Sequence, residues 1–437
     1  MKALTFQGAK DVRVQNVPDP VLIDDDDIFL KVTPTPICGF VPHIYRGKIP
    51  AMKDVYILGH VFMGTASEIG QAATSLKKGD LVVISFVNVC GACFYCNKTL
   101  FAACDITNLG RGDILKKKSA NAGGDLFGYS RPHVSLRGGQ ANYVHVPKAN
   151  GVLLKMSGAL TDKRVLLSSD FLPTGYQAAV NAQLGPGSSV AIYGASPVGL
   201  AATLYAPFLR AEKTVLHDHN DDHLKFVQDV DDVASLNFAH DDDPADILLK
   251  STDFHAGDDV IDTVGLEANG SAIETVMTTL KLEGSGGPAL RQCIEVTGRR
   301  DVVSVSGACA GLIHGILFGD AVAKGLIFKM GQTHAQRYMP VLLELLELLE
   351  HYWQWKNEAR ADPPPHEAGR CGAGICCVCG TKRRLVYGYA YPLTRMTGLQ
   401  TAMNLRPEGN LQRQLRRHNQ CRAIFKTLAT KCLVSVS

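Results

Sequence analysis

The chain has 437 residues, of which 46% are hydrophobic, and a formal net charge of +3. This length and apolar content are enough to bury two hydrophobic cores, so we expect a soluble globular protein of two domains. The first residues lack the apolar run of a secretory signal, and no stretch reaches the roughly 18 apolar residues of a membrane span. These features argue against a secreted or membrane protein and favour a cytoplasmic one.

Residues 1–150 contain short runs of β-branched and aromatic residues separated by glycine and proline turns. Segments 28–33 and 80–86 are examples of such runs, which are typical of strands. The pattern predicts a β-rich domain. We place it at residues 1–165, with a cysteine-rich lobe at about 88–106.

That lobe holds Cys90, Cys93, Cys96 and Cys104, in a C-x2-C-x2-C-x7-C array. Four thiolates at this spacing can close a tetrahedron around one Zn²⁺. Such a site has no open position and is therefore structural. The alternatives are four buried free cysteines or two disulfides, but short regular spacing in a chain without secretory features favours the metal.

A strand, a glycine-containing turn and a helix follow from residue 189. Segment 189–193 predicts the strand, and the helical period of 198–209 predicts the helix. The turn at 194–199 matches G-x-G-x-x-G, except that Ser196 stands at the second glycine. This pattern indicates a βαβ unit that binds a dinucleotide.

Asp218 ends the next predicted strand, where a carboxylate accepts hydrogen bonds from an adenosine ribose. The same carboxylate repels a 2′-phosphate, which favours NAD over NADP. The alternative is an ordinary strand, turn and helix with a surface Asp. Pro207 falls inside the predicted helix, where an interior proline costs roughly 3 kcal/mol.

The last part of the chain differs in composition. Residues 381–437 carry eleven Lys or Arg and one acid, and a proline-rich break near 360 precedes Cys371, Cys376, Cys377 and Cys379. We predict domains at 166–345 and 346–437, the second atypical and partly disordered. A basic tail beside a zinc lobe leaves nucleic-acid binding as a remote alternative, although charge runs are usually solvated.

Several further motifs follow one another along the chain. They are, in this order, Cys38-Gly39 with His43, Gly59-His60, the four-cysteine array, Gly138 to Tyr143, Asp170 to Tyr176 and the turn at 194–199. Together they resemble the motifs of the zinc-containing medium-chain alcohol dehydrogenases, and segments 170–176 and 331–333 resemble the glutathione-independent formaldehyde dehydrogenase branch. Over residues 1–350 this resemblance implies a GroES-like catalytic domain, a Rossmann coenzyme domain with a doubly wound parallel sheet, and a catalytic zinc between them.

The resemblance places the catalytic zinc ligands at Cys38, His60 and Asp170. Three protein ligands leave a fourth position for a substrate oxygen. Taken singly, each residue has a simpler interpretation: a small buried thiol, a satisfied core histidine and a helix cap before Pro173.

The sequence departs from the family around these ligands. Phe40 and Val41 stand where the family has a hydroxyl that starts a proton relay to His43 and a carboxylate that supports the zinc-bound histidine. Val61 replaces a second carboxylate. The loss of such groups typically reduces metal affinity or activity about 10- to 100-fold. A homologue that binds NAD and zinc with impaired catalysis is therefore an alternative.

The resemblance also implies a set of coenzyme contacts, for whose apolar members plain core packing is the alternative. His223 stands where the family often has Arg. The contacts are Gly39 and His43 near the nicotinamide ribose, Gly194, Pro197, Val198, Gly199 and Asp218 at the pyrophosphate and adenosine ribose, and Val264, Ala308, Gly331 and Thr333 around the nicotinamide.

The sequence as a whole predicts a zinc- and NAD-dependent dehydrogenase with one catalytic and one structural zinc. Its expected substrate is a small alcohol or a hydrated aldehyde of the formaldehyde type, and a homo-oligomer, a dimer or a tetramer, is expected. The resemblance fades after residue 350, and 355–386 and 403–437 match nothing in the family. An altered reading frame or retained non-coding sequence is one hypothesis for this stretch. Loss of the family's closing strand would leave an edge of the catalytic domain exposed.

Overall fold

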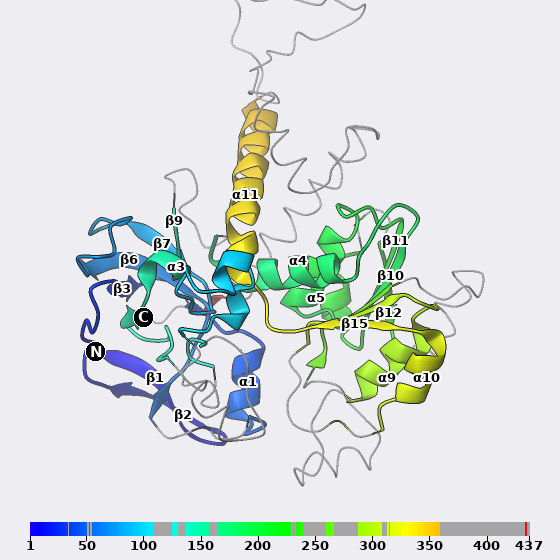
Figure 1. Ribbon diagram of the computed structural model, residues 1–437, viewed down its shortest axis with the longest axis horizontal. Coiled ribbons are helices and arrows are strands. Elements are labelled where there is room, and N and C mark those ends of the chain that lie inside the picture. Colours follow the sequence, from blue (N-terminus) through cyan, green and yellow to red (C-terminus); the bar gives the residue numbers. More distant parts are fainter. Residues whose placement is uncertain are drawn as a thin grey trace, which may run out of the picture.

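The computed structural model has two lobes, which lie on either side of helix α11 (Ala335–Glu358) in Figure 1. No helix among the described residues is long and apolar enough to cross a membrane. The structure describes residues 1–33, 35–49, 52, 55–107, 125–129, 136–156, 165–228, 230, 233–238, 259–265, 287–307, 313, 315–358 and 433–434.

The β-rich lobe contains a five-stranded antiparallel sheet in the order β8-β3-β6-β7-β9 and a three-stranded sheet in the order β2-β1-β5. Alternation places Ile28 and Leu30 in the core and Lys31 outside. The elements are β1 (Lys2–Gly8), β2 (Asp11–Asn16), β3 (Ile28–Val32), β4 (Thr35–Pro36), α1 (Phe40–Tyr45), β5 (Tyr56–Ile57), β6 (Phe62–Ile69), β7 (Leu81–Ile84), η1 (Cys96–Lys98), η2 (Phe101–Ala103), β8 (Tyr143–Val146), α3 (Ala149–Val152), β9 (Leu153–Lys155) and η3 (Val165–Ser169).

The second lobe is a six-stranded parallel sheet in the order β12-β11-β10-β13-β14-β15. The predicted fold class is thus confirmed. Strand order reverses on either side of β10, and ligands of such sheets bind beyond the strand ends at this reversal. The elements are α4 (Phe171–Asn181), β10 (Ser189–Tyr193), α5 (Pro197–Tyr205), β11 (Lys213–Asp218), α6 (Asp221–Leu224), β12 (Val233–Asn237), β13 (Asp259–Asp262), α9 (Gly287–Val296), β14 (Val302–Val305), α10 (Phe318–Lys324) and β15 (Ile327–Met330).

The helix predicted over 198–209 extends four residues further than helix α5, which ends at Tyr205. Helix α5 stops at Tyr205, and the N–H of Ala206 donates the closing bond to Ala202. Pro207 lies beyond this cap, so its missing N–H breaks no bond inside the helix. The strand before the turn matches its prediction at Ser189–Tyr193.

Two elements near the end of the chain pack against earlier parts of the fold. The predicted boundary at 345 falls inside α11, which packs against α4 and η3. Strand β16 (Leu433–Val434) pairs antiparallel with β4, so Leu433 lies opposite Pro36 and Val434 opposite Thr35. Part of the sequence unlike the family therefore does pair with the catalytic domain. Cys371, Cys376, Cys377 and Cys379 and nearly all of the basic tail lie outside the described residues.

Candidate metal and coenzyme site

Cys38, His60 and Asp170 meet although they are far apart in the sequence. Cys38 follows β4, His60 precedes β6, and Asp170 precedes α4. Oδ2 of Asp170 lies 3.6 Å from Sγ of Cys38 and 3.2 Å from Nε2 of His60. Ligand atoms of a tetrahedral zinc site lie about 3.3 to 3.8 Å apart, given the usual bond lengths. The sulfur, nitrogen and oxygen donors therefore fit one Zn²⁺.

The two oxygens of Asp170 have different partners. The residue occupies the N-cap position of α4 but makes no capping hydrogen bond with its side chain. Instead, the hydroxyl of Thr174 donates to Oδ1 at 3.0 Å, and Oδ2 is left facing Cys38 and His60. The interpretation of Asp170 as a simple helix cap thus fails, and Thr174 fixes the orientation of the carboxylate.

Glycines hold the His60 backbone closely. Gly59 has φ +95, and a Cβ on Gly128 would lie 2.5 Å from the Gly59 carbonyl oxygen. A Cβ on Gly138 would likewise overlap the carbonyl of Leu58. Only glycine permits backbones to approach this closely. The position of His60 therefore depends on a loop at 126–129 and on the Gly138 turn.

Aromatic side chains surround the His60 ring. Phe40 stacks on Tyr129 with ring centroids 3.7 Å apart. The His60 ring meets Tyr129 edge-on at 5.6 Å and Phe40 at 6.2 Å, and Phe86 lies at 6.1 Å. This group keeps water from the imidazole side of the three-residue cluster.

His60 lacks one expected hydrogen bond. It is 2% exposed, and its buried Nδ1 has no hydrogen-bond partner among the residues that the structure describes. It is therefore not the satisfied core histidine of the simpler interpretation. Val41 and Val61 are both buried in apolar clusters. An unsupported Nδ1 agrees with the loss of carboxylates at these two positions.

His43 lies in α1 and is 5% exposed. Phe40 contacts both histidines, with ring centroids 6.0 Å from His43 and 6.2 Å from His60. Gly39, the N-cap of α1, has open space where a Cβ would point. Gly39 and His43 thus lie beside the cluster of Cys38, His60 and Asp170. Their contacts with a coenzyme stay a prediction.

The four cysteines of the array also converge. Sγ of Cys93 lies 3.5 Å from Sγ of Cys96 and 3.9 Å from Sγ of Cys104. With Cys90, the four sulfurs lie within 4.8 Å of one another, and all four residues are free thiols. The two-disulfide alternative is therefore wrong, and the spacing fits one tetrahedral metal ion.

Burial opposes the ionisation of several cysteines in this array. Burial raises the pKa of Cys90 and of Cys96. Burial also opposes ionisation of Cys93, but N–H groups of Cys96 and Asp105 lower its pKa to about 6. One thiolate forms readily and its neighbours resist further negative charge, which is the behaviour expected where Zn²⁺ supplies the missing charge.

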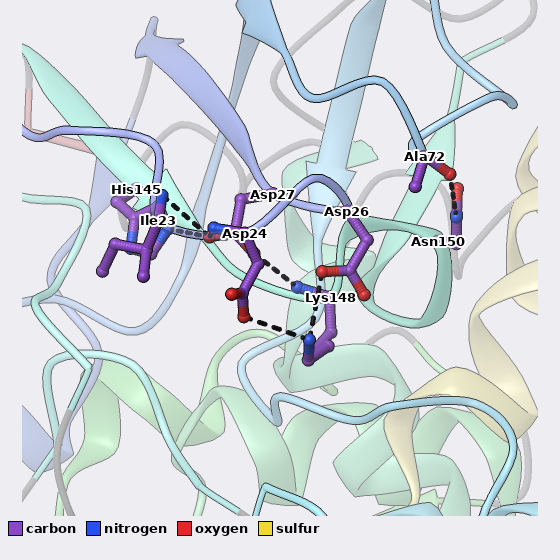
Figure 2. A network of polar contacts seen from close by, with 8 residues as sticks. All are labelled: Ile23, Asp24, Asp26, Asp27, Ala72, His145, Lys148 and Asn150. Atoms are coloured by element: carbon purple, nitrogen blue, oxygen red, sulfur yellow. Dashed lines mark hydrogen bonds and ion pairs between the residues drawn. The ribbon is translucent and has the colours of Figure 1, made fainter.

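A third group of possible metal ligands, Asp24, Asp26 and Asp27, is already engaged by protein groups. Figure 2 shows Lys148 between the first two, with Nζ 3.3 Å from Asp24 and 3.1 Å from Asp26. Nε2 of His145 lies 2.7 Å from Oδ2 of Asp27. These contacts join the start of β3 to β8 and α3, which is a structural role.

The glycine turn after β10 has the geometry of a nucleotide-binding loop. Gly194 has φ +95, and a Cβ on Gly199 would overlap the Gly194 carbonyl oxygen. Ser196 caps α5, and its Oγ accepts the Gly199 N–H at 3.4 Å. The hydroxyl at the second glycine position thus satisfies one donor that the helix terminus would otherwise offer.

Asp218 ends β11 as predicted and lies beside this turn. Its Oδ2 accepts the Ala195 N–H at 2.5 Å, and its Oδ1 accepts the N–H of His219 at 2.7 Å. Burial favours the neutral carboxyl, but hydrogen bonds from His223 and Ala195 outweigh it and lower the pKa of Asp218. The carboxylate therefore stays charged, and the alternative of a plain surface Asp does not hold at 6% exposure.

The other predicted coenzyme residues that the structure describes follow strands of the parallel sheet or begin α5. Val264 follows β13, next to Thr263, whose hydroxyl donates to the Gly194 carbonyl at 2.9 Å. Pro197 and Val198 begin α5, Gly331 and Thr333 follow β15, and Ala308 is outside the described residues.

Thr174 and Tyr129 belong to the site but were not predicted from the sequence. Thr174 could have been found, because residues four positions apart on a helix, such as Asp170 and Thr174, lie on the same face. Tyr129 gives no comparable signal, since it comes from an irregular loop.

Comparisons with known proteins agree with this geometry. The family described as alcohol dehydrogenase GroES-like domain matches residues 24–157. The zinc-type alcohol dehydrogenase-like protein AdhB of Bacillus subtilis is 34% identical over 348 residues, which is 79% of this chain and 89% of that protein. The glutathione-independent formaldehyde dehydrogenase of Pseudomonas aeruginosa is 32% identical over 374 residues, covering 79% and 87%.

A solved structure extends the likeness to the fold. The alcohol dehydrogenase TADH from Thermus sp. ATN1 matches with a TM-score of 0.65 and 28% identity, over 80% of this chain and 90% of that one. Three observations lead to one conclusion: the sequence relatives cover most of both chains, the fold matches, and two clusters of metal-donor residues converge. The chain belongs to the zinc-containing medium-chain alcohol dehydrogenase family and is a zinc oxidoreductase.

Proposed function

We propose that this protein transfers hydride from a small alcohol or a hydrated aldehyde of the formaldehyde type to NAD. The observation that carries the proposal is the convergence of Cys38, His60 and Asp170 on one point. The formaldehyde-type substrate is supported by the 32% identity to the Pseudomonas aeruginosa enzyme.

A zinc ion held by Cys38, His60 and Asp170 would act as a Lewis acid toward the substrate oxygen. The protein's own groups orient this site. Thr174 turns the Asp170 carboxylate toward the other two donors, and the stacked rings of Phe40 and Tyr129 exclude water from its side. Water exclusion strengthens the electrostatic interactions inside the site.

His43 is the proposed proton acceptor. Its ring is buried beside Phe40, which carries no hydroxyl to relay the proton. The proton would therefore pass through water rather than through the side chain at position 40. Proton transfer by a positioned side chain typically contributes about 10²- to 10⁴-fold in rate.

NAD is proposed as the coenzyme because of Asp218. A charged carboxylate at the end of β11 accepts hydrogen bonds from ribose hydroxyls and repels a 2′-phosphate. Gly194 and Gly199 bring the backbone of the turn close to where the pyrophosphate would lie.

We also propose a cytoplasmic homo-oligomer. The described cysteines are free thiols, as in a reducing compartment. Among the described strands, β15 lies at an edge of the parallel sheet, and edge strands invite pairing with another chain. Apolar side chains are exposed there and on α10, at Phe318, Val322, Ile327 and Met330. Sedimentation analysis of the wild type and of Met330→Lys tests this assembly, and a monomeric wild type would contradict it.

Metal analysis and a single-turnover assay test the activity. We expect two zinc ions per chain and zinc-dependent formation of reduced nicotinamide from NAD and short alcohols or formaldehyde. If the protein binds coenzyme and two zinc ions but shows no turnover, the alternative of a catalytically impaired homologue is favoured. The similarity to known relatives does not support that alternative. The nucleic-acid alternative depends on residues 381–437, of which the structure describes only 433–434.

A further inference from the structure

His334 connects three parts of the molecule. Its ring Nδ1 accepts a hydrogen bond from the backbone N–H of Ala102 at 3.1 Å. Ala102 lies in η2, two residues before Cys104, in the loop that carries the four cysteines. The backbone N–H of His334 donates to Oε1 of Gln177 at 2.9 Å. Gln177 lies on α4, about two turns after Asp170.

The ring is in the right state to accept this bond. Burial lowers the pKa of His334, and the positive charge of Arg337 acts in the same direction. A neutral imidazole with its proton on Nε2 presents Nδ1 as an acceptor. Nearby, the side chain of Gln336 donates to the Val87 carbonyl at 2.6 Å. The start of α11 thus makes two hydrogen bonds to this part of the chain, one to the cysteine lobe at Ala102 and one to Val87, just before the lobe.

We propose that His334 is a positioning residue through which the four-cysteine metal site holds the nicotinamide end of the coenzyme. The inference rests on the proposed function, since it takes Gly331 and Thr333 as nicotinamide contacts. Both lie in the short segment between β15 and α11, and Thr333, 4% exposed, directly precedes His334. The Ala102 and Gln177 bonds fix the end of this segment before the coenzyme arrives, so less ordering entropy is lost on binding.

This arrangement makes the two sites thermodynamically linked. A metal bound by the four cysteines orders η2 and therefore orients the Ala102 N–H toward His334. By reciprocity, bound coenzyme must then stabilise the metal in the cysteine array by the same factor. Loss of one neutral hydrogen bond corresponds to an expected change of about 3- to 10-fold in coenzyme affinity.

Two variants separate the hydrogen bond from simple packing. His334→Leu removes the acceptor, whereas His334→Asn places a carboxamide oxygen at the branch that Nδ1 occupies in histidine. The dissociation constants of NADH and of AMP are measured calorimetrically for each. We expect His334→Leu to weaken NADH binding about 3- to 10-fold and to leave AMP unchanged, because AMP reaches only the adenosine end. His334→Asn should restore most of the NADH affinity.

The second readout is the rate at which a chelator extracts zinc from the cysteine array. NADH should slow this release in the wild type and in His334→Asn, but not in His334→Leu. Equal NADH affinity in all three proteins would overturn the inference, as would a loss shared equally by AMP. If His334→Leu fails to fold, zinc release from the wild type that is indifferent to NADH still overturns it. A wild type that binds neither NADH nor AMP removes the proposed function, and this inference with it.

Discussion

Oγ1 of Thr174 lies 3.0 Å from Oδ1 of Asp170 and thereby leaves Oδ2 to face the sulfur of Cys38 and the ring of His60. Replacing Thr174 by Val keeps the shape of the side chain but removes the donor. Removal of such an outer partner of a metal ligand typically reduces metal affinity or activity about 10- to 100-fold. We expect Thr174→Val to lower the zinc affinity of this site about 10- to 100-fold. Competition with a chromogenic chelator measures this affinity.

Thr174→Ser is the matched control, since it keeps the hydroxyl on the same helix turn. It should bind zinc nearly as tightly as the wild type. Equal affinities for the Val and Ser variants would show that the hydroxyl does not orient Asp170.

Gly199→Ala should remove coenzyme binding while both metal sites persist. A Cβ at this position overlaps the carbonyl oxygen of Gly194, so the turn and α5 must separate. The affinity for AMP, measured by calorimetry, is expected to fall at least about 100-fold, because a backbone shift misplaces several contacts at once. Gly319→Ala on α10 is the control, since nothing lies within 4 Å of its Cβ. Unchanged AMP affinity in Gly199→Ala would contradict a role for this turn.

Graded chelation should remove the two metals in sequence. The cysteine array draws its ligands from one short loop, whereas Cys38, His60 and Asp170 gather distant segments and leave Nδ1 of His60 without a partner. The second site is therefore expected to lose zinc first. Activity should disappear with the first equivalent, and circular dichroism should change only with the second. Simultaneous loss of both metals with unfolding would mean that the sites have similar strength.

The pH dependence of stability should carry a contribution from Asp27. Burial alone would raise its pKa, but hydrogen bonds from the Asp24 N–H and from His145 outweigh it and lower the pKa. The ionised carboxylate therefore stabilises the fold above the unfolded pKa of about 3.9. That stabilisation is lost as the pH falls through the lower pKa of the folded state.

Asp27→Asn should lower the free energy of unfolding at neutral pH by about 1.5 to 3 kcal/mol, the usual contribution of a hydrogen bond to a charged group. Denaturant titrations should show the variant and the wild type converging in acid. Asp19→Asn, at a mostly exposed ion pair with the Met1 amine, is expected to change stability far less. A difference between Asp27→Asn and wild type that persists in acid would rule out ionisation as its source.

Local patterns predicted local structure well. Segment 189–193, the turn and Asp218 follow one another in the chain, and so do the four cysteines, so their geometry depends on short stretches. The end of α5 was missed because helical periodicity continues past Tyr205, whereas Pro207 prevents the helix from following it.

Contacts between distant segments left little trace in the sequence. Cys38 and Asp170 are 132 positions apart, and no periodicity relates them, so only the family resemblance grouped them before their geometry was known. Ala102 and His334 are 232 positions apart and belong to no recognised motif. Tyr129 reaches the Phe40 ring from a loop whose path is set by the contact between Gly128 and Gly59. Such contacts follow from the tertiary fold, which propensity and pattern do not specify.

The pairing of β16 with β4 also bears on how the protein is made. Leu433 lies opposite Pro36, so all of residues 37–432 must be synthesised before β4 acquires this neighbour. At typical rates of translation the interval is about 20 to 80 s. During that time the thiol of Cys38, two residues beyond β4, sits next to an open strand edge in the nascent chain. Strand β4 of the β-rich lobe thus gains this partner only after the parallel-sheet lobe has been synthesised.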